Sequence, residues 1–310
     1  IIHYQSWLKF PALELILLRL QKRHGTGLVY TAHDWLPHRP RPYQGYLFKA
    51  FYRVFDRIIV HAESGREFLR DRLGVAADRI VVIPHGNYGF FLTDKSLTME
   101  KSRQRLGLDA DRFWFLFFGR IDAHKGLDVA IRALARMGQE KDRQGAGVQS
   151  RALPGLIVAG KPEKEDMRTY EQLIDDLQLR ERVRLFTGHI PVPEIQLYFQ
   201  AADAVVLPYR ESSTSGVFHL AMGFKKPVVA CAVGGLKDTI IDGVTGIMVP
   251  PEDEGMLARA MDRVAGDSAT RQRLAMGWAR VEAEHSWENI ASLTQKAYQD
   301  VAPAARPGFS

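Results

Sequence analysis

The turn at residues 119–126 places two positive charges where a hydrophobic stretch gives way to a helix. In the segment FFGRIDAHKGLDVAIRAL, a strand-like run ends at Gly119, Arg120 follows at once, and Lys125 precedes the helix. Open α/β sheets bind ligands at the carboxyl ends of their strands, where helix amino-termini offer N–H groups. A planar guanidinium and a lysine point charge in such a place suit a diphosphate. The alternative is a pair of solvated surface cations.

A second turn of this kind lies in the stretch PYRESSTSGVFHLAMGFKKPVV, where Glu211 precedes small hydroxyl residues and a glycine. Small residues at the start of a helix let backbone N–H groups reach a phosphate or a sugar hydroxyl. The residues expected to face a ligand from this turn are Thr214, Ser215, Gly216 and Val217. The alternative is an ordinary capped helix start. A third small-residue turn, in AVGGLKDTIIDG, makes a shared ligand site more credible than any one turn does.

Other chemistries are disfavoured by motifs that the sequence lacks. The histidines of HGTG, TAHDW, IPHG and TGHIP stand singly, without the paired spacing of a zinc site, so no metal is expected. The sequence contains no G-x-S-x-G elbow, P-loop or G-x-G-x-x-G, which argues against a hydrolase, a nucleotide kinase or a dinucleotide dehydrogenase. The single cysteine, Cys231, lies in an apolar run and is expected to be a buried small hydrophobe, so no disulfide is expected.

The elements that must position these turns alternate along the chain as strands and helices. The first series has the strand-like runs IIHYQ, GLVYTAH, RIIVHAE and RIVVIPHG, with helices predicted over 11–23, 44–55 and 63–73. After a polar segment at 93–110, the second series has FWFLFFG, GLIVAG, RVRLFTG, AVVLP and PVVAC, with helices over 125–137, 165–179, 193–201 and 216–224. This βαβ rhythm predicts an α/β protein with two Rossmann-like domains. The polar stretch GQEKDRQGAGVQSRALPG is expected to be a surface loop of the second domain.

Composition and charge bound the class of protein. With 310 residues and 46% hydrophobic content, the chain can form two packed cores of a soluble protein. Its positive excess lies in residues 1–92, which hold 13 Lys and Arg against 7 Asp and Glu. This excess favours phosphates, nucleic acid or an anionic membrane, or is simply a solvated face, and no nucleic-acid-binding signature occurs. The apolar run FPALELILLRL is too short and too charged to span a bilayer.

The order and content of the motifs resemble the family 4 retaining glycosyltransferases of the GT-B fold over about residues 1–301. The motifs that carry the resemblance are TAHDW, IVHAES, IPHG, FFGRIDAHKGLDVAIRAL, LIVAG, the run from FTGHIP to VPPED, and HSWENIASLTQKAYQDV. The resemblance implies two Rossmann-like domains whose parallel sheets face across a cleft. A nucleoside-diphosphate sugar would bind there, mainly to the second domain, without a metal or another cofactor.

The resemblance also divides the chain. It implies an acceptor domain at 1–92, a donor domain at 93–285, and a terminal helix at 286–303 that crosses back onto the first domain. The first series begins inside a strand, and residues 1–60 contain no glycine-rich strand-to-helix turn. The first domain is therefore expected to be truncated at its amino terminus.

Several residues acquire roles through the resemblance. Arg120 and Lys125, beside Gly119, match the pair that binds the donor diphosphate and stabilises the leaving group, in agreement with the independent interpretation of that turn. His33 in TAHDW matches a histidine that faces the donor sugar from the first domain. The segment whose backbone reads the nucleobase edge is matched by Gly188, His189 and Ile190.

The sequence departs from the family at its best-known signature, two glutamates separated by seven residues. Alignment on LAMGFKKPVV puts the first glutamate position at Ser212 and the second at Leu220. Glu211 stands one residue early, and counting eight forward from it reaches His219, which is interpreted as an accident of helix spacing. A Ser-Gly turn, as at Ser215, marks a subset of the family that tolerates loss of the second carboxylate. Glu211 is therefore expected to take the sugar-facing role, with a weakened contact to the ribose.

The expected activity is retaining, metal-independent transfer of a sugar to a glycan, a lipid-linked acceptor or a small molecule, in cytoplasmic polysaccharide biosynthesis. No protein nucleophile is evident, and the resemblance implies front-face attack assisted by the leaving diphosphate. Positioning and charge stabilisation would then carry the rate. The alternative is an impaired relative that binds a nucleotide sugar without turnover. A sugar epimerase of the same fold would need cleft carboxylates placed for acid–base chemistry, which the sequence does not locate.

The segment LPHRPRPYQGYLFKAFYRVFD is dense in aromatic and basic residues. One interpretation is a core helix with cations that snorkel to the surface. The other is a patch for a lipid-linked acceptor, which would put the protein in peripheral contact with an anionic membrane at its inner face.

Overall fold

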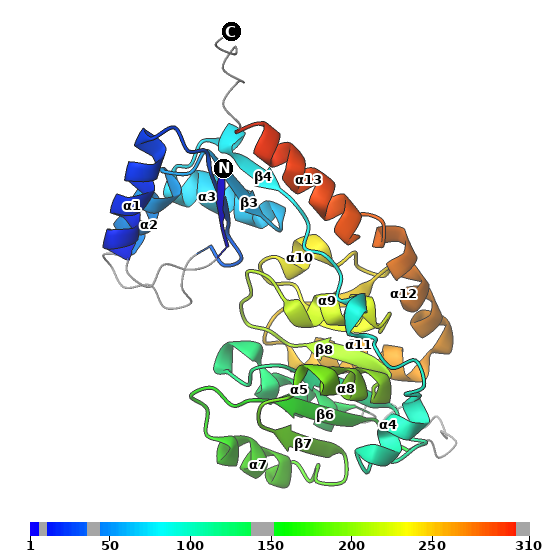
Figure 1. The fold of residues 1–310 in the computed structure, drawn as a ribbon. Helices are drawn as coiled ribbons and strands as arrows, with labels where there is room; N and C mark the ends of the chain where they lie inside the picture. The colour runs from blue at the N-terminus through cyan, green and yellow to red at the C-terminus, as the bar shows by residue number, and fades with distance from the viewer. Residues whose placement is uncertain (6–10, 36–43, 138–151, 302–310) are drawn as a thin grey trace. The chain divides into compact units, whose positions relative to one another are not determined.

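The computed structural model describes residues 1–5, 11–35, 44–137 and 152–301, and it divides into two compact units. Unit 1 comprises residues 1–86 and 283–310, and unit 2 comprises residues 87–282 (Figure 1). The boundaries expected from the sequence lay after residues 92 and 285. The basic loop LPHRPRPY and most of the polar loop that begins at Gly138 lie outside the described residues.

Unit 1 contains a four-stranded parallel sheet in the order β1-β2-β3-β4. Its strands are β1 (Ile2–Tyr4), β2 (Leu28–Thr31), β3 (Arg57–Val60) and β4 (Ile80–Val82). Its helices are α1 (Pro11–Arg23), α2 (Gln44–Tyr52), α3 (Glu63–Leu73) and α13 (Trp287–Gln299), with a 3-10 turn η1 (Ala77–Arg79). The helices predicted over 11–23 and 63–73 are confirmed with these bounds. The helix predicted over 44–55 ends three residues earlier than expected, at Tyr52.

The aromatic residues of α2 and the turn after it form much of the unit 1 core. Tyr30 of β2 lies with its ring centroid 5.0 Å from that of Phe51 and 5.1 Å from that of Phe55, and both phenylalanines are buried. The interpretation of this segment as a core helix is therefore confirmed for these side chains. Helix α13 packs on the same sheet through Ala297, and the Tyr298 hydroxyl lies 2.7 Å from Nδ1 of His3.

Unit 2 contains a six-stranded parallel sheet in the order β10-β9-β8-β5-β6-β7. Its strands are β5 (Trp114–Phe118), β6 (Gly155–Gly160), β7 (Val183–Thr187), β8 (Ala204–Leu207), β9 (Val228–Cys231) and β10 (Gly246–Val249). Its helices are α4 (Met99–Arg105), α5 (Leu127–Arg136), α7 (Met167–Asp176), α8 (Ile195–Ala201), α9 (Gly216–Gly223), α10 (Leu236–Thr239), α11 (Glu254–Gly266) and α12 (Ser268–Val281). The 3-10 turns are η2 (Gly89–Phe91), η3 (Ala123–Lys125) and η4 (Val192–Glu194).

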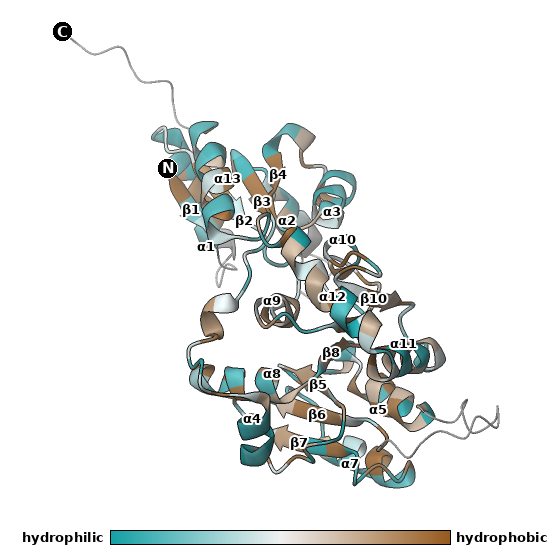
Figure 2. Ribbon diagram, turned by 90° about the vertical axis from the view of Figure 1, so that its right-hand side faces the viewer, coloured by the Kyte–Doolittle hydropathy of each residue, from teal (hydrophilic) through white to brown (hydrophobic). Residues whose placement is uncertain are grey.

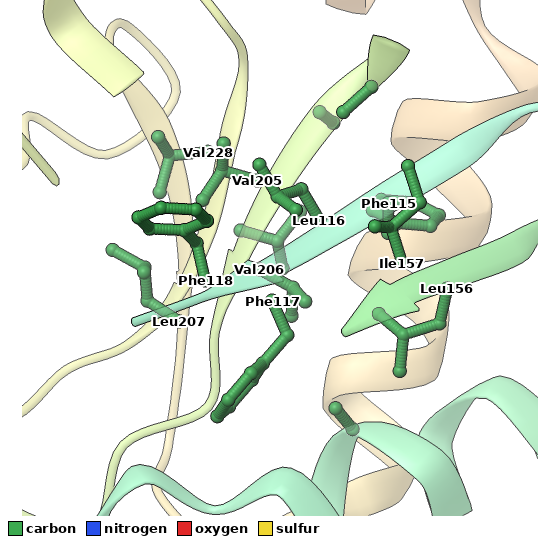
Figure 3. Packing of buried hydrophobic residues seen from close by; sticks show 14 of the residues in the cluster. Phe115, Leu116, Phe117, Phe118, Leu156, Ile157, Val205, Val206, Leu207 and Val228 are labelled. Atoms are coloured by element: carbon green, nitrogen blue, oxygen red, sulfur yellow. The ribbon is translucent and has the colours of Figure 1, made fainter. Parts of the chain in front are cut away.

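The central strands of unit 2 are apolar throughout because both faces of the sheet are covered. Every residue of β5, β6, β8 and β9 is buried, including Cys231, as expected for that cysteine. Figure 3 shows Phe115, Leu116, Phe117 and Phe118 of β5 packed among Leu156, Ile157, Val205, Val206, Leu207 and Val228. In Figure 2, β6 is largely brown, whereas α4 is largely teal. The core therefore holds the strands rigidly and leaves their carboxyl ends to carry polar loops.

The strand order reverses direction at β5, which lies between β8 and β6. The loop after β5 leads to α5, and the loop after β8 leads to α9. In an open α/β sheet, this reversal opens a crevice at the carboxyl ends of the two strands. The two turns that the sequence singled out therefore begin at neighbouring strand ends.

A close approach between backbones joins these two loops at Gly126. This glycine ends η3 with φ +67°, and a Cβ atom placed on it would lie 2.0 Å from the carbonyl oxygen of Pro208. Real Cβ atoms do not come so close to a backbone oxygen, so only glycine fits. Gly107 has a similar φ of +62° but no atom within 4 Å of such a Cβ.

We predict that Gly126→Ala destabilises unit 2 by about 3 kcal/mol, because the strain of a positive φ adds to a clash with backbone. Gly107→Ala is the matched control and should cost about 1 kcal/mol, since it carries the φ strain alone. Urea unfolding followed by circular dichroism measures both. Equal losses for the two variants would show that the contact with Pro208 is unimportant.

Candidate functional site

The candidate site lies at the carboxyl ends of β5 and β8, which pair directly through Phe115 with Ala204 and Leu116 with Val205. Gly119 follows β5, and a Cβ on it would lie 3.3 Å from Cγ2 of Val217 at the start of α9. The structure thus brings the turn at 119–126 against the turn at 211–217. Both were predicted to face one ligand.

Arg120 extends from the end of β5 and is exposed, with 59% of its side chain accessible. Its Nη1 atom donates a hydrogen bond to Oε2 of Glu163 at 2.8 Å. Glu163 follows the neighbouring strand β6, and its backbone N–H donates to the carbonyl of Ile121 at 2.8 Å. An ion pair so open to solvent contributes little stability, so Arg120 can exchange this partner for an anionic ligand at small cost.

Lys125 lies at the end of η3 and is half-buried. Its Nζ atom lies 3.7 Å from the ring centroid of Tyr209, a residue only 1% exposed. The turn itself is fixed locally, because the Asp122 side chain accepts from the His124 N–H and the Asp122 carbonyl accepts from the Lys125 N–H at 2.8 Å. The ammonium group is therefore held on an aromatic face at the site.

Helix α9 begins at a cap that leaves its first N–H groups at the same edge of the sheet. Ser215 is buried, and its hydroxyl accepts from the N–H of Phe218 at 3.2 Å. Gly216 is exposed, and Val217 is half-buried beside Gly119. A helix start of this kind carries partial positive charge, which favours an anion.

Glu211 is exposed in the middle of the loop between β8 and α9. The next residue, Ser212, is buried, and its hydroxyl donates to the carbonyl of Thr214 at 2.9 Å. Its carbonyl accepts from the N–H of Gly235, and a Cβ on Gly234 would lie 1.6 Å from that carbonyl oxygen. The third small-residue turn therefore supports the second by direct backbone contact, which requires glycine at Gly234.

The two positions considered for a second glutamate, His219 by counting and Leu220 by alignment, lie in the core. His219 is 4% exposed, and its ring centroid lies 5.4 Å from that of Phe218 and 6.1 Å from that of Tyr88. Leu220 is also buried.

The predicted nucleobase segment lies further along the same edge. Gly188 follows β7, two strands from β5 in the sheet order, and its N–H donates to the carbonyl of Gly160 at 2.9 Å. A Cβ on Gly188 would meet no atom within 4 Å, so the space above it is open. His189 is exposed and Ile190 half-buried.

In unit 1, His33 belongs to a group of histidines at the carboxyl edge of that sheet. Nδ1 of His33 lies 3.1 Å from Nε2 of His61, whose Nδ1 lies 3.0 Å from the carbonyl oxygen of Ile83. The His85 ring centroid lies 5.1 Å from that of His61. Burial lowers the pKa of His33 and, more strongly, lowers the pKa of His61 to about 4. These imidazoles are therefore neutral at neutral pH.

Two features of the unit 2 site and one feature of unit 1 were not predicted from the sequence. Tyr209 belongs to the PYRE segment, but its aromatic ring gave no sign of a contact with Lys125. Glu163 follows β6 in GKPEKED, and the rule that ligands gather at strand ends would have found it. The histidines were interpreted as isolated, yet His61 and His85 come after adjacent parallel strands, so sheet order brings them beside His33.

The described residues contain neither a candidate metal centre nor a helix that could span a membrane. Among them, no group of three or more His, Cys, Asp or Glu side chains is arranged to hold a metal ion. No helix within the described ranges is both long enough and apolar enough to cross a bilayer.

Comparison with known families decides the class of protein. The model of the family described as Glycosyl transferases group 1 matches residues 112–267, about half of the chain. The chain belongs to the group 1 glycosyltransferases. A second model, described as Glycosyltransferase Family 4, matches residues 1–86, so this group 1 glycosyltransferase carries both halves of the expected resemblance. The expected glycosyltransferase family is confirmed, while retention and the Ser-Gly variant stay predictions.

Related sequences include D-inositol 3-phosphate glycosyltransferases. That of Corynebacterium diphtheriae is 31% identical over 225 residues, which cover 72% of this chain and 50% of that protein. That of Frankia alni is 29% identical over 320 residues, covering 98% of this chain and 75% of that protein. This group 1 glycosyltransferase chain thus spans about half the length of the first relative and three quarters of the second.

Solved structures establish the fold. Sucrose-phosphate synthase of Thermosynechococcus elongatus superposes with a TM-score of 0.76 at 26% identity, over 96% of this chain and 72% of that one. HepE of Anabaena, solved in complex with UDP, gives a TM-score of 0.78 at 20% identity, over 96% and 78% of the two chains. The expected GT-B fold of this group 1 glycosyltransferase is confirmed.

The histidine group predicts a loss of stability in mild acid. With an ordinary pKa of 6.5 in the unfolded chain and about 4 in the native state, His61 is protonated more readily when unfolded. The free energy of unfolding should therefore be highest above pH 6.5 and fall as the pH drops toward 4, by at most roughly 3 kcal/mol from His61. Urea unfolding at a series of pH values measures this fall. His61→Gln should flatten it, with His33 and His85 supplying the remaining slope, and an unchanged slope would contradict the assignment.

Proposed function

We propose that the chain transfers a sugar from a nucleoside-diphosphate sugar to a hydroxylated acceptor, with retention of anomeric configuration and without a metal. The observation that carries the proposal is the meeting of Arg120, Lys125 and the α9 amino-terminus at the paired ends of β5 and β8. Two cations and a helix start at one strand reversal suit a diphosphate better than any other common metabolite group. Membership of the family supports this choice.

In the proposed reaction, Arg120 and Lys125 bind the diphosphate and stabilise the charge that accumulates on it as the glycosidic bond breaks. The N–H groups of Gly216 and Val217 add the positive end of α9. Lys125, held on the Tyr209 ring, and the α9 N–H groups are fixed before the donor binds, whereas Arg120 exchanges Glu163 for the diphosphate. This is the work that a metal ion does in other enzymes.

Glu211 is assigned to a hydroxyl of the donor sugar as a positioning group. It is exposed at the end of β8, beside the turn that would hold the diphosphate. The nucleobase would lie against the backbone of Gly188, His189 and Ile190, further along the same edge. His33 belongs to unit 1, and its role toward the donor sugar stays a prediction. Front-face attack by the acceptor, with the leaving diphosphate taking the proton, would give retention.

The comparisons suggest which donors and acceptors to test first. HepE has been solved with UDP-glucose, which makes UDP-sugars the first donors to test. The relatives are named for D-inositol 3-phosphate, which adds a phosphorylated cyclitol to the glycan, lipid-linked and small-molecule acceptors proposed from the sequence. The proposal also includes a cytoplasmic location. If the acceptor is lipid-linked, the protein would contact the membrane peripherally.

A second candidate is a relative that binds nucleotide sugars without turnover. The position aligned with the second glutamate of the family is Leu220, which is buried and cannot contact a ribose. Binding without release of nucleoside diphosphate in the presence of acceptors would favour this candidate over an active transferase.

We predict that Arg120→Met and Lys125→Met each weaken binding of a nucleoside diphosphate by about tenfold, because each removes a charged hydrogen-bond donor to phosphate. Calorimetric titration with UDP, GDP and ADP measures this, and release of the diphosphate from the matching sugar nucleotide measures turnover. Arg180→Met is the control, since this exposed arginine precedes β7 at the opposite edge of the sheet. If both site variants bind the nucleoside diphosphate as tightly as the unmodified chain does, the donor-site assignment is wrong.

A further prediction concerns the carboxylate that competes for Arg120. Glu163→Gln should tighten binding of the same diphosphate by about threefold at low salt, because Arg120 no longer leaves an ionised partner. This difference in affinity should become smaller at higher salt, because salt screens the exposed Arg120–Glu163 pair of the unmodified chain. Glu171→Gln removes the same charge from an exposed position on α7 and should leave the affinity unchanged. A weaker affinity in Glu163→Gln would mean that Glu163 helps to orient Arg120.

A further inference from the structure

We propose that Tyr209 and Arg210 are positioning residues that hold Lys125 and its turn in place for the donor diphosphate. This inference rests on the proposed function, because it deepens the role of Lys125 there. Together with Pro208, the two residues form the extension of β8 (residues 208–210). All three residues of this extension contact the turn that carries Lys125.

Tyr209 contacts Lys125 directly. Its buried ring lies under the ammonium group, with Nζ 3.7 Å from the ring centroid, well inside the range of a cation–π interaction. Its hydroxyl lies 3.4 Å from Oγ of Ser215, the residue that caps α9. One rigid side chain thus connects the lysine with the helix start, the two groups expected to share the diphosphate. An ammonium held on a ring face keeps its other N–H groups available to phosphate.

Arg210 fastens the backbone of the same turn. Its N–H donates to the carbonyl of His124 at 2.8 Å, and its Nη1 donates to the carbonyl of Ala123 at 2.7 Å. The guanidinium also makes two hydrogen bonds to Asp128 in the first turn of α5, at 2.9 and 2.8 Å. The guanidinium thus binds the Ala123 carbonyl, the backbone N–H binds the His124 carbonyl, and the turn is tied to the helix that follows it.

The charge state of this contact is stable. Burial would raise the pKa of Asp128, but the hydrogen bonds and the positive charge of Arg210 outweigh burial and leave that pKa lowered. The Nε atom of Arg210 also donates to Glu252 at 2.9 Å. Because Arg210 is paired with two carboxylates, its charge is locally balanced. It therefore acts by holding the turn that carries Lys125, and not by attracting the diphosphate directly.

Pro208 completes the contact from the backbone side. Its carbonyl oxygen occupies the space that a Cβ on Gly126 would need. The extension of β8 therefore holds the turn that carries Lys125 by three contacts: the Pro208 backbone, the Tyr209 ring and the Arg210 guanidinium. Lys125 is placed by three consecutive residues that follow β8, the strand paired with β5.

The test compares binding of a nucleoside diphosphate with binding of the bare nucleoside, by calorimetry on the full chain. The probes are whichever of UDP, GDP and ADP binds most tightly and its matching nucleoside. Tyr209→Leu should weaken diphosphate binding by about fivefold and leave nucleoside binding unchanged, because only the phosphates contact Lys125. Tyr209→Phe should restore most of the affinity, since phenylalanine keeps the ring face. Arg210→Lys should also weaken only diphosphate binding, because lysine keeps the charge but lacks the fork that spans the turn and Asp128.

The decisive measurement compares the effect of Tyr209→Leu with and without the Lys125→Met substitution. If Tyr209 acts through Lys125, then Tyr209→Leu should cause no further loss of diphosphate affinity once Lys125 is gone. Tyr198→Leu, at another buried tyrosine of unit 2, is the control for lost packing and should not change the ratio of the two affinities. Thermal melts confirm folding, and Arg210→Lys carries the same comparison should Tyr209→Leu not fold.

The outcomes separate this inference from the proposed function. Two results would overturn the positioning role while leaving the donor site intact. One is an equal loss of diphosphate and nucleoside affinity in Tyr209→Leu. The other is a Tyr209→Leu effect on diphosphate affinity that is as large with Lys125→Met as without it. A chain that binds the diphosphate no better than the nucleoside, or is unaffected by Lys125→Met, would overturn the donor site and this inference together.

Discussion

The direct parallel pairing of β5 with β8 is the constraint on which the candidate site depends. These strands are far apart in sequence, and between them lie β6 and β7, which extend the sheet away on the other side of β5. The reversal leaves the ends of β5 and β8 adjacent with no other strand between their loops. Lys125 and Arg120 come from one loop, and Glu211 and the α9 start come from the other. The buried apolar strands beneath hold this juxtaposition, so the chemistry of the edge is set by the packing of the interior.

Much of the fold could be predicted from periodicity and turn chemistry. The order of strands was apparent up to β9, because apolar runs such as those of β5 and β6 end at glycines. Helix α4 was missed because its sequence is almost wholly polar, although Thr98 caps it. Helices α11 and α12 were not predicted, yet Asp253 and Asp267 cap their amino-termini in the usual way. Those two helices were recoverable from the sequence.

The site was predictable to the extent that its residues follow strands. Arg120, Lys125 and Ser215 could be placed at the sheet edge because each belongs to a strand-to-helix turn. The pairing of Arg120 with Glu163, and of Lys125 with Tyr209, depends on which strands are neighbours, which the spacing of residues does not reveal. The same holds for the histidines of unit 1. Each was a single histidine in sequence, and only parallel register places His33 against His61.

The glycines at the site have a consequence for the entropy of binding. At Gly126 and Gly234, main chain packs directly against main chain, on the carbonyls of Pro208 and Ser212. No layer of rotatable side chains separates these backbones, so the loops have few alternative conformations to lose when a ligand arrives. Binding energy that a looser pocket would spend on ordering its loops is available here for discrimination between ligands. Gly126 and Gly234 thus influence how strongly the larger side chains of the site can discriminate between ligands.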